Sequence, residues 1–221
     1  KLERRGEVSF IEGMRLLADA SSDLKEGGDE EQKAWTVLQA GSAFRDILDG
    51  LRNPATLASA KITEDLKATL RPYQKTGLNW LAFLTNLGLG ACLADDMGLG
   101  KTIQVLALLL NRRKQDPGAP SVLVVPASLL ANWKAEAARF APALQIVIAH
   151  PSEMRREELS ELGDHLGPVD LVITTYSMVF REEWFQQYPW DLALLDEAQA
   201  IKNPASRQTK AVKKLQARAR V

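Results

Sequence analysis

The stretch Leu93-Ala94-Asp95-Asp96-Met97-Gly98-Leu99-Gly100-Lys101-Thr102 decides the fold of this chain of 221 residues. The apolar run from Gly90 to Ala94 is typical of a short buried strand, and the apolar residues from Thr102 to Arg113 predict a helix. Glycines let consecutive backbone N–H groups turn toward one anion, and the start of the following helix offers further donors to that anion. The order of strand, glycine-containing loop and helix therefore predicts a phosphate-binding loop.

Two side chains at the end of this loop suit a nucleotide. The Lys101 ammonium can reach the β- and γ-phosphates, and the Thr102 hydroxyl can ligate Mg²⁺. The general pattern G-x-x-x-x-G-K-[ST] is broken at its first position, where Asp95 replaces glycine. A Gly-Lys-Thr triplet also arises by chance, so the prediction depends on the flanking strand and helix. The expected nucleotide-binding residues of the loop are Asp96, Met97, Gly98, Leu99, Gly100, Lys101 and Thr102.

Downstream of residue 70, helical patterns alternate with short apolar runs. The expected strands are 121–125, 144–149, 169–174 and 192–195, and the expected helices are 72–87, 128–140, 153–162 and 204–217. Ser128 is the expected cap of the second of these helices. Short apolar strands alternating with helices indicate an α/β fold, a parallel sheet with helices on both faces. Ligands of such sheets bind where the strands end, which points to the residues just after Ala94, Val125, Thr174 and Leu195.

A carboxylate pair follows the last predicted strand, in the sequence Asp196-Glu197-Ala198-Gln199. One of the two acids can hold Mg²⁺, because hard cations prefer oxygen ligands, while the other can orient or activate a water for attack on the γ-phosphate. The alternative is that the two acids merely begin a helix, where negative charge is favourable. Together with the phosphate loop, the pair favours nucleotide hydrolysis.

The first 65 residues differ from the rest of the chain. Apolar residues recur at helical spacing in 9–19 and 35–51, and a polar segment with Gly27 and Gly28 separates them. We therefore predict a small, mainly helical appendage or linker over residues 1–65, followed by one ATP-binding domain over residues 66–221.

Composition excludes several classes of protein. The chain has 28 basic and 28 acidic residues, which excludes a uniformly basic arm, and its one cysteine cannot form an internal disulfide. No apolar run approaches the ~18–20 residues that a membrane helix requires. These features predict a soluble, cytoplasmic protein without a membrane partner, and the start at Lys1 suggests a part of a longer chain.

Zero net charge conceals an asymmetry. From Ile201 onward there are seven basic residues and no acid. One interpretation is an ordinary solvated surface; the other is a surface that meets phosphate or a neighbouring domain.

Several motifs together resemble the N-terminal motor lobe of the Swi/Snf family of helicase-like ATPases, in helicase superfamily two, and most closely its bacterial branch. Asp95 is normal for that family, whereas Asp96 stands where glutamate is more usual. The resemblance covers about residues 66–215. The matching stretches, in the family's order, are 70–74 (LRPYQ) with Gly77 and 80–81 (WL), 93–102, 124–130 (VVPASLL) with 132–133 (NW), 174–176 (TTY), 196–199 (DEAQ) and 201–203 (IKN).

The resemblance implies a RecA-like lobe that binds ATP with Mg²⁺ and belongs to a DNA-stimulated ATPase. Such an enzyme translocates on double-stranded DNA and remodels or displaces protein–DNA complexes, which implies a nucleoid-associated protein with transcription or repair proteins as further partners. It also requires a second RecA-like lobe that supplies transition-state arginines. We therefore expect the chain by itself to hydrolyse little ATP.

The resemblance also assigns individual roles. Gln74, with Arg71 nearby, would read the adenine edge, and Gln199 would couple the nucleotide to the second lobe. The expected catalytic residues are Lys101, Asp196, Glu197 and Gln199, and the expected metal ligands are Thr102 and Asp196. The residues expected to meet DNA phosphates are Pro126, Ser128, Asn132, Thr174, Thr175 and Lys202.

Some of these residues also have a simpler structural interpretation. Without the resemblance, Gln74 is expected to be a polar residue on a helix surface. Trp133, Cys92 and the aromatic residues from Trp184 to Trp190 read best as core packing.

Two other functions also fit the loop. A nucleotide-dependent interaction module of the transcription machinery would bind partners without DNA-driven turnover. A phosphate-loop kinase or GTPase is the second, but the chain has no Asn-Lys-x-Asp sequence for guanine. Displacement of bound ATP by GTP would favour it.

Overall fold

The computed structural model describes residues 50, 51, 57, 59, 60, 62–96 and 98–221. Nearly all of the predicted helical appendage, as well as Met97, therefore lies outside the described residues. The chain divides into two compact units between Arg52 and Asn53, and the second unit contains all of the expected site residues. Part of the expected linker belongs to this unit, because the Ala60 N–H donates to Asn79 Oδ1 at 2.8 Å.

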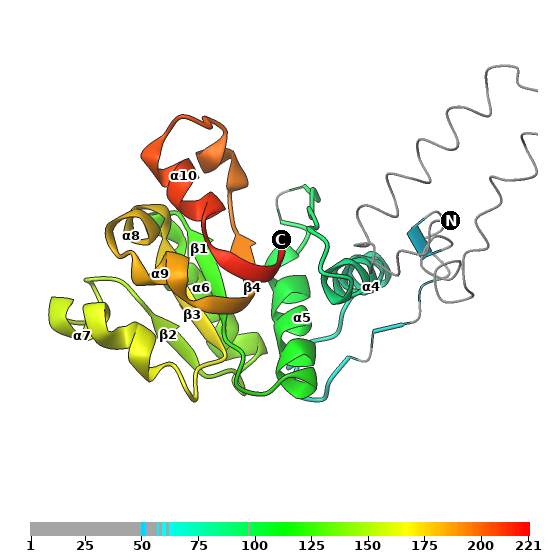
Figure 1. Ribbon diagram of the computed structural model, residues 1–221. Helices are drawn as coiled ribbons and strands as arrows, with labels where there is room; N and C mark the ends of the chain where they lie inside the picture. The colour runs from blue at the N-terminus through cyan, green and yellow to red at the C-terminus, as the bar shows by residue number, and fades with distance from the viewer. Residues whose placement is uncertain (1–49, 52–56, 58, 61, 97) are drawn as a thin grey trace, which may run out of the picture. The chain divides into compact units, whose positions relative to one another are not determined.

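Short helices and strands alternate along the second unit (Figure 1). Their order is α4 (Pro72–Asn86), α5 (Lys101–Gln115), β1 (Ser121–Val125), η2 (Ala127–Leu129), α6 (Leu130–Phe140), β2 (Ile146–Ile148), α7 (Arg156–Glu161), η3 (Leu162–His165), β3 (Leu171–Thr175), α8 (Tyr176–Arg181), α9 (Trp184–Gln187), β4 (Pro189–Leu195), η4 (Ala198–Ile201), α10 (Arg207–Lys213) and β5 (Gln216–Arg220). In the described part of the chain, no helix combines the length and the apolar character needed to cross a bilayer.

The five strands form one parallel sheet in the order β2-β3-β1-β4-β5. Val125 at the end of β1 lies opposite Thr175 at the end of β3, and Val124 lies opposite Leu195 at the end of β4. The carboxyl ends of the three central strands therefore share one edge. The predicted parallel α/β fold is confirmed.

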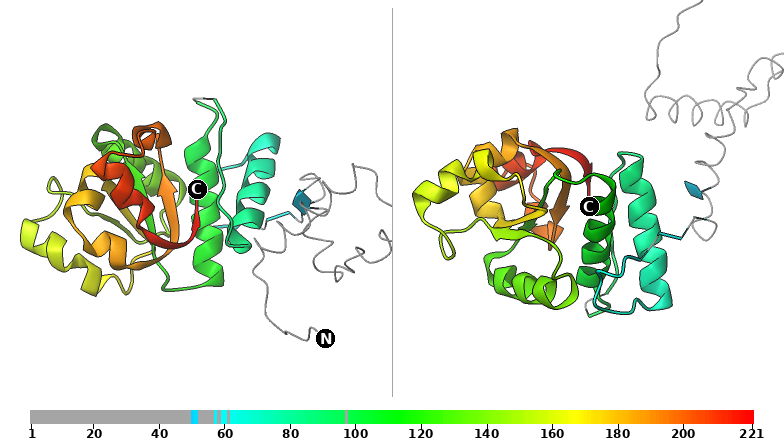
Figure 2. Two further views of the ribbon diagram at one scale, coloured as in Figure 1. Left: turned by 45° about the horizontal axis from the view of Figure 1, so that its top comes forward. Right: turned by 90° about the horizontal axis from the view of Figure 1, so that it is seen from below.

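Helices cover both faces of this sheet because alternate strand residues point to opposite sides. Leu123 and Ile173 pack in one buried cluster with α4, α5 and α6, whereas Val122 and Val172 pack in another with α8 and α10. In both views of Figure 2, α4 (teal) runs beside α5 (green). Each fully buried aliphatic side chain contributes about 1.5–3 kcal/mol, so this two-layer burial is the main stabilising term.

The strand expected from Gly90 to Ala94 does not form. This segment has no regular structure, and the Ala91 N–H donates to the Arg220 carbonyl oxygen of β5 at 2.8 Å. A ladder requires a repeated series of such bonds, so a single one aligns the segment with β5 without making it a strand. The segment nevertheless runs parallel to β5, because Gly88 lies nearest Arg218 and Gly90 lies nearest Arg220.

The expectation of one helix over 204–217 is also wrong. Helix α10 ends at Lys213, and the basic residues that follow belong to β5. Arg218 and Arg220 are exposed while Ala219 is buried, which is the alternation of period two that defines a strand. Alanine packs well in both helices and strands, so the composition of this segment did not indicate a strand.

Two smaller expectations are wrong. Ser128 does not cap α6, because it lies in the 3₁₀ turn η2 and Leu129 occupies the N-cap position. Cys92 is exposed rather than buried, since its segment forms no strand inside the sheet.

The predicted aromatic packing is confirmed. Phe185 and Trp190 are buried, and the Trp184 and Phe185 rings stack with centroids 3.9 Å apart. The Trp190 Nε1–H donates to the Phe185 carbonyl oxygen at 2.7 Å, which satisfies its one donor within the core.

Candidate nucleotide and DNA site

The phosphate loop opens at the same edge of the sheet as the carboxylate pair. The segment before the loop runs parallel to β5, and β5 pairs in parallel with β4, which leads into Asp196. Residues 95–100 therefore emerge on the side where β4 ends. Chain direction alone brings the predicted nucleotide and metal residues to one edge.

The Lys101 side chain turns back over the loop. Its Nζ donates to the carbonyl oxygens of Asp95 at 2.6 Å and Asp96 at 3.2 Å. Gly100, directly before it, has φ +78° and forms the N-cap of α5. The loop thus holds an ammonium group beside the first N–H groups of α5, and both are suited to a phosphate.

Helix α4 clasps this loop through two adjacent side chains. The Tyr73 hydroxyl and the Gln74 Nε2–H both donate to the Leu99 carbonyl oxygen, at 3.0 and 2.9 Å. Gln74 Oε1 accepts from the Arg71 N–H at 2.9 Å, so the amide joins the start of α4 to the loop. Gln74 is buried rather than on the helix surface, and its contact with adenine stays a prediction.

Gln104 is a loop contact that sequence reasoning missed. This fully buried side chain donates from Nε2 to Asp95 Oδ2 at 3.0 Å and orients the residue that replaces the first glycine of the motif. Its Oε1 has no partner among the described residues. The available signal was one amide in the otherwise apolar run 103–110.

Asp196 is the most firmly held acid at this edge. Its N–H donates to the Val124 carbonyl oxygen at 2.9 Å, Oδ2 accepts from Trp133 Nε1–H at 2.7 Å, and Oδ1 accepts from the Glu197 N–H at 3.0 Å. The Tyr176 hydroxyl donates to the Asp196 carbonyl oxygen at 2.7 Å. Burial raises the pKa of this hydroxyl, and the charges of Asp196 and Glu197 raise it further, so Tyr176 remains a donor at neutral pH.

Glu197 has an unusual backbone. Its φ of 52° makes it the one residue other than glycine with positive φ among the described positions. The left-handed conformation costs an ordinary residue about 1–2 kcal/mol. Strain of this kind occurs where a side chain must point in a required direction. The Glu197 carboxylate also accepts a hydrogen bond from Gln199 Nε2, which brings two predicted catalytic residues together.

The chemistry of the donors fits Mg²⁺. Both Asp196 oxygens accept one hydrogen bond and keep free lone pairs, and Thr102 offers a half-buried hydroxyl. Among the described residues there is no group of three or more acids, histidines or cysteines that could hold a metal. That is compatible with Mg²⁺, which proteins usually bind with one or two carboxylates together with water and substrate phosphates.

The residues predicted to meet DNA divide into two groups. Ser128, Asn132 and Lys202 are exposed, and Pro126 is half-buried. The other two are buried and already bonded internally, because Thr174 Oγ1 donates to the Ala149 carbonyl oxygen and Thr175 Oγ1 accepts from the Met178 N–H. Any phosphate contact at Thr174 and Thr175 would therefore not come from a free hydroxyl.

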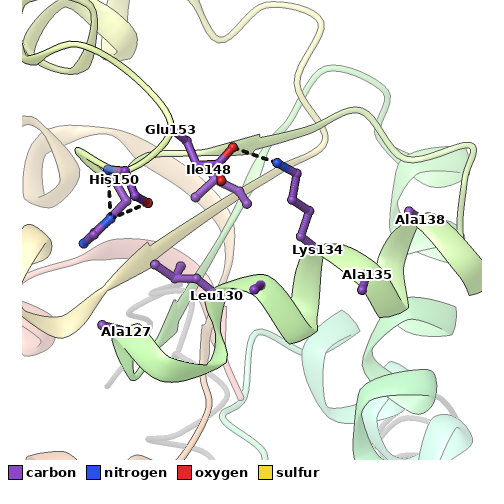
Figure 3. A pocket seen from close by; sticks show the side chains of 10 residues that line it. Ala127, Leu130, Lys134, Ala135, Ala138, Ile148, His150 and Glu153 are labelled. Carbon is purple, nitrogen blue, oxygen red and sulfur yellow. Dashed lines mark hydrogen bonds and ion pairs between the residues drawn. The ribbon is translucent and has the colours of Figure 1, made fainter.

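A pocket of about 430 Å³ lies between α6 and the segment after β2 (Figure 3). Alanines of α6 and η2 line one side of it, while Lys134 donates to Glu153 Oε2 at 2.7 Å and joins the two segments. Its lining residues all lie outside the phosphate loop, so this pocket is separate from the nucleotide site.

Comparison with known proteins identifies the family of this site. Residues 73–221 match the family described as the SNF2-related domain. The chain belongs to this family. This SNF2-related domain is 36% identical to YwqA of Bacillus subtilis strain 168, and the match covers 97% of the domain's chain. It is also 35% identical to the chromatin-remodeling ATPase INO80 of Kluyveromyces lactis over 90% of its length.

Solved structures agree with this assignment. The SWI2/SNF2 ATPase core of Sulfolobus solfataricus in complex with dsDNA is 38% identical, with a TM-score of 0.63. That match covers 72% of this chain and 33% of the Sulfolobus chain. The predicted RecA-like, N-terminal lobe of a superfamily-two ATPase is thus confirmed. The SNF2-related domain spans only 24% of YwqA and 14% of INO80.

Proposed function

We propose that this SNF2-related domain is the ATP-binding lobe of a DNA-stimulated ATPase that translocates on double-stranded DNA and remodels or displaces protein–DNA complexes. The observation that carries the proposal is the convergence of the Lys101 loop and the Asp196-Glu197 pair at one sheet edge. The DNA-bound Sulfolobus ATPase core supports duplex DNA as the partner. We further propose a place of action on the nucleoid, alongside transcription or repair proteins.

Each residue of this edge has a defined part in the proposed reaction. Lys101 and the first N–H groups of α5 bind the β- and γ-phosphates. Thr102 and Asp196 would hold Mg²⁺, which neutralises phosphate charge when bound. Glu197 orients the attacking water and accepts its proton, and Gln199, whose Nε2 donates to Glu197, would couple the nucleotide to the second lobe.

The second lobe completes this site. An arginine supplied from outside a nucleotide-binding domain typically contributes about 10³–10⁵ in rate. The isolated domain is therefore expected to bind ATP and to turn it over slowly.

The test is ATP turnover by the full-length protein, with and without double-stranded DNA. DNA should raise turnover, and Lys101→Ala or Glu197→Gln should abolish the increase. Lys114→Ala is the matched control, because this exposed lysine lies at the other end of α5 and pairs with Asp65. Turnover that survives Lys101→Ala would contradict the proposal, and absence of DNA stimulation would contradict it and favour a nucleotide-gated interaction module.

A further inference from the structure

Two buried aromatic side chains hold Asp196 from two different elements. Trp133 in α6 is 5% exposed, and its Nε1–H donates to the carboxylate Oδ2 at 2.7 Å. Tyr176 at the start of α8 is also 5% exposed, and its hydroxyl donates to the Asp196 carbonyl oxygen at 2.7 Å. One contact fixes the side chain and the other fixes the main chain of the same residue.

Both aromatic residues belong to segments that are expected to face DNA. Trp133 directly follows the exposed Asn132, and Tyr176 directly follows Thr175 at the end of β3. The two aromatic side chains bond to Asp196, while Asn132 is exposed on α6 and the buried Thr175 ends β3. The segment of Trp133 therefore joins an exposed residue of the proposed DNA surface to Asp196, and the segment of Tyr176 joins the end of β3 to Asp196.

We propose that Trp133 and Tyr176 are positioning residues that transmit DNA binding to Asp196. This inference rests on the proposed function. Hydrogen bonds to a metal-binding carboxylate set its orientation, and loss of such a partner typically costs about 10–100-fold in metal affinity or activity. Because the interior is close-packed, a small displacement of α6 or α8 on DNA moves a donor relative to the Asp196 oxygens.

Trp133→Phe and Tyr176→Phe test this role, since Tyr176→Phe removes only the hydroxyl, and Trp133→Phe removes the five-membered ring with its Nε1–H and keeps an aromatic ring. Trp190→Phe is the matched control. Trp190 is 2% exposed and donates from Nε1 to a backbone carbonyl at 2.7 Å, but that carbonyl belongs to Phe185. The control thus loses the same kind of buried hydrogen bond without touching Asp196.

The measurements are kcat and KM for ATP in the full-length protein, with and without double-stranded DNA, at a series of Mg²⁺ concentrations. For both test variants we expect the DNA-stimulated kcat to fall about 10-fold and half-saturating Mg²⁺ to rise. We expect KM for ATP to stay within about twofold, and the ratio of stimulated to basal rate to fall. Trp190→Phe should keep the wild-type ratio.

Two results would overturn the inference. One is a stimulated rate within twofold of wild type in both variants, and the other is an equal fall of basal and stimulated rates, which indicates plain structural damage. Unfolding midpoints identify a variant that does not fold, in which case the other variant decides. A wild-type enzyme that DNA does not stimulate would instead contradict the proposed function.

Discussion

At the scale of single residues, Gly100 is the most tightly constrained position of the phosphate loop. Its φ is +78°, and a β-carbon there would lie 2.5 Å from Gln74 Nε2. Gly100→Ala must therefore expel Gln74 from the Leu99 carbonyl. We expect a loss of about 2–3 kcal/mol in the free energy of unfolding, from backbone strain together with one lost hydrogen bond, and weaker ATP binding.

Gly98→Ala separates these two causes. Gly98 has a similar φ of +81°, but a β-carbon there meets nothing within 4 Å. This substitution should cost only the backbone strain. In chemical denaturation, the free energy of unfolding of Gly98→Ala should therefore be about 1 kcal/mol higher than that of Gly100→Ala. Equal losses in the two variants would mean that Gln74 does not hold the loop.

Glu197 carries a second residue-level prediction. Because its φ is 52°, Glu197→Gly should be more stable than Glu197→Ala by about 1 kcal/mol, whereas both should abolish turnover. Glu183 is the control, with an ordinary φ of −65°. There the order should reverse, because glycine has the larger unfolded-state entropy. Denaturant titration of the four variants measures both differences, and the same order at both positions would contradict the strain.

The site could be predicted only in part from single residues. Lys101 and Asp196 lie in patterns that are local in the sequence, so a short window is enough to predict their roles, and those roles stay predictions. The Trp133 indole donates to a carboxylate 63 residues away in sequence, and nothing local to Trp133 distinguishes that role from core packing. The contacts of Gln104 and Tyr176 were not predicted for the same reason, because packing between elements determines their hydrogen-bond partners.

At the scale of elements, one buried ion pair ties α5 to β4. The Arg112 Nε–H donates to Asp191 Oδ2 at 2.8 Å, and a second bond joins Nη2 to Oδ1. This pairing raises the pKa of Arg112 further. Arg112→Ala leaves Asp191 as an unpaired buried charge, so we expect a loss of about 3–5 kcal/mol in unfolding free energy.

The exposed pair of Lys134 and Glu153 serves as the comparison. Both of these side chains are largely solvent-accessible, so Lys134→Ala should cost no more than about 1 kcal/mol. Urea unfolding of the two variants measures the contrast. A loss below about 1 kcal/mol for Arg112→Ala would mean that the pair does not join the two elements.

Elements with a strong local period were predictable, and those defined by their neighbours were not. Strand β1 and helix α5 each have a continuous apolar pattern, and both form close to the expected bounds. Strand β5 (QARAR) alternates alanines with glutamine and arginines, a composition that suits a helix equally well. Only its pairing with β4 selects the extended form, and pairing between distant segments is not visible in a local window.

At the scale of the whole molecule, zero net charge hides an uneven distribution of the basic residues. The chain as a whole is neutral, but the seven basic residues after Ile201 are all exposed and no acid lies among them. Lys202 follows the turn η4 that leads away from the carboxylate pair. The proposed DNA surface therefore includes Lys202, which lies close in sequence to the carboxylate pair.

This distribution predicts DNA binding that depends on salt and not on sequence. Each phosphate contact releases counterions, so the logarithm of affinity should fall linearly with the logarithm of salt concentration. Lys202→Ala should reduce the magnitude of that slope by about 1 for every duplex sequence tested. Lys114→Ala should leave the slope unchanged, because Lys114 pairs with Asp65 on another part of the unit. Fluorescence anisotropy of the full-length protein with two unrelated duplexes, across a salt series, gives the slopes. An unchanged slope in Lys202→Ala would remove this lysine from the DNA surface, and a strong preference for one duplex would show contacts to bases rather than to phosphates alone.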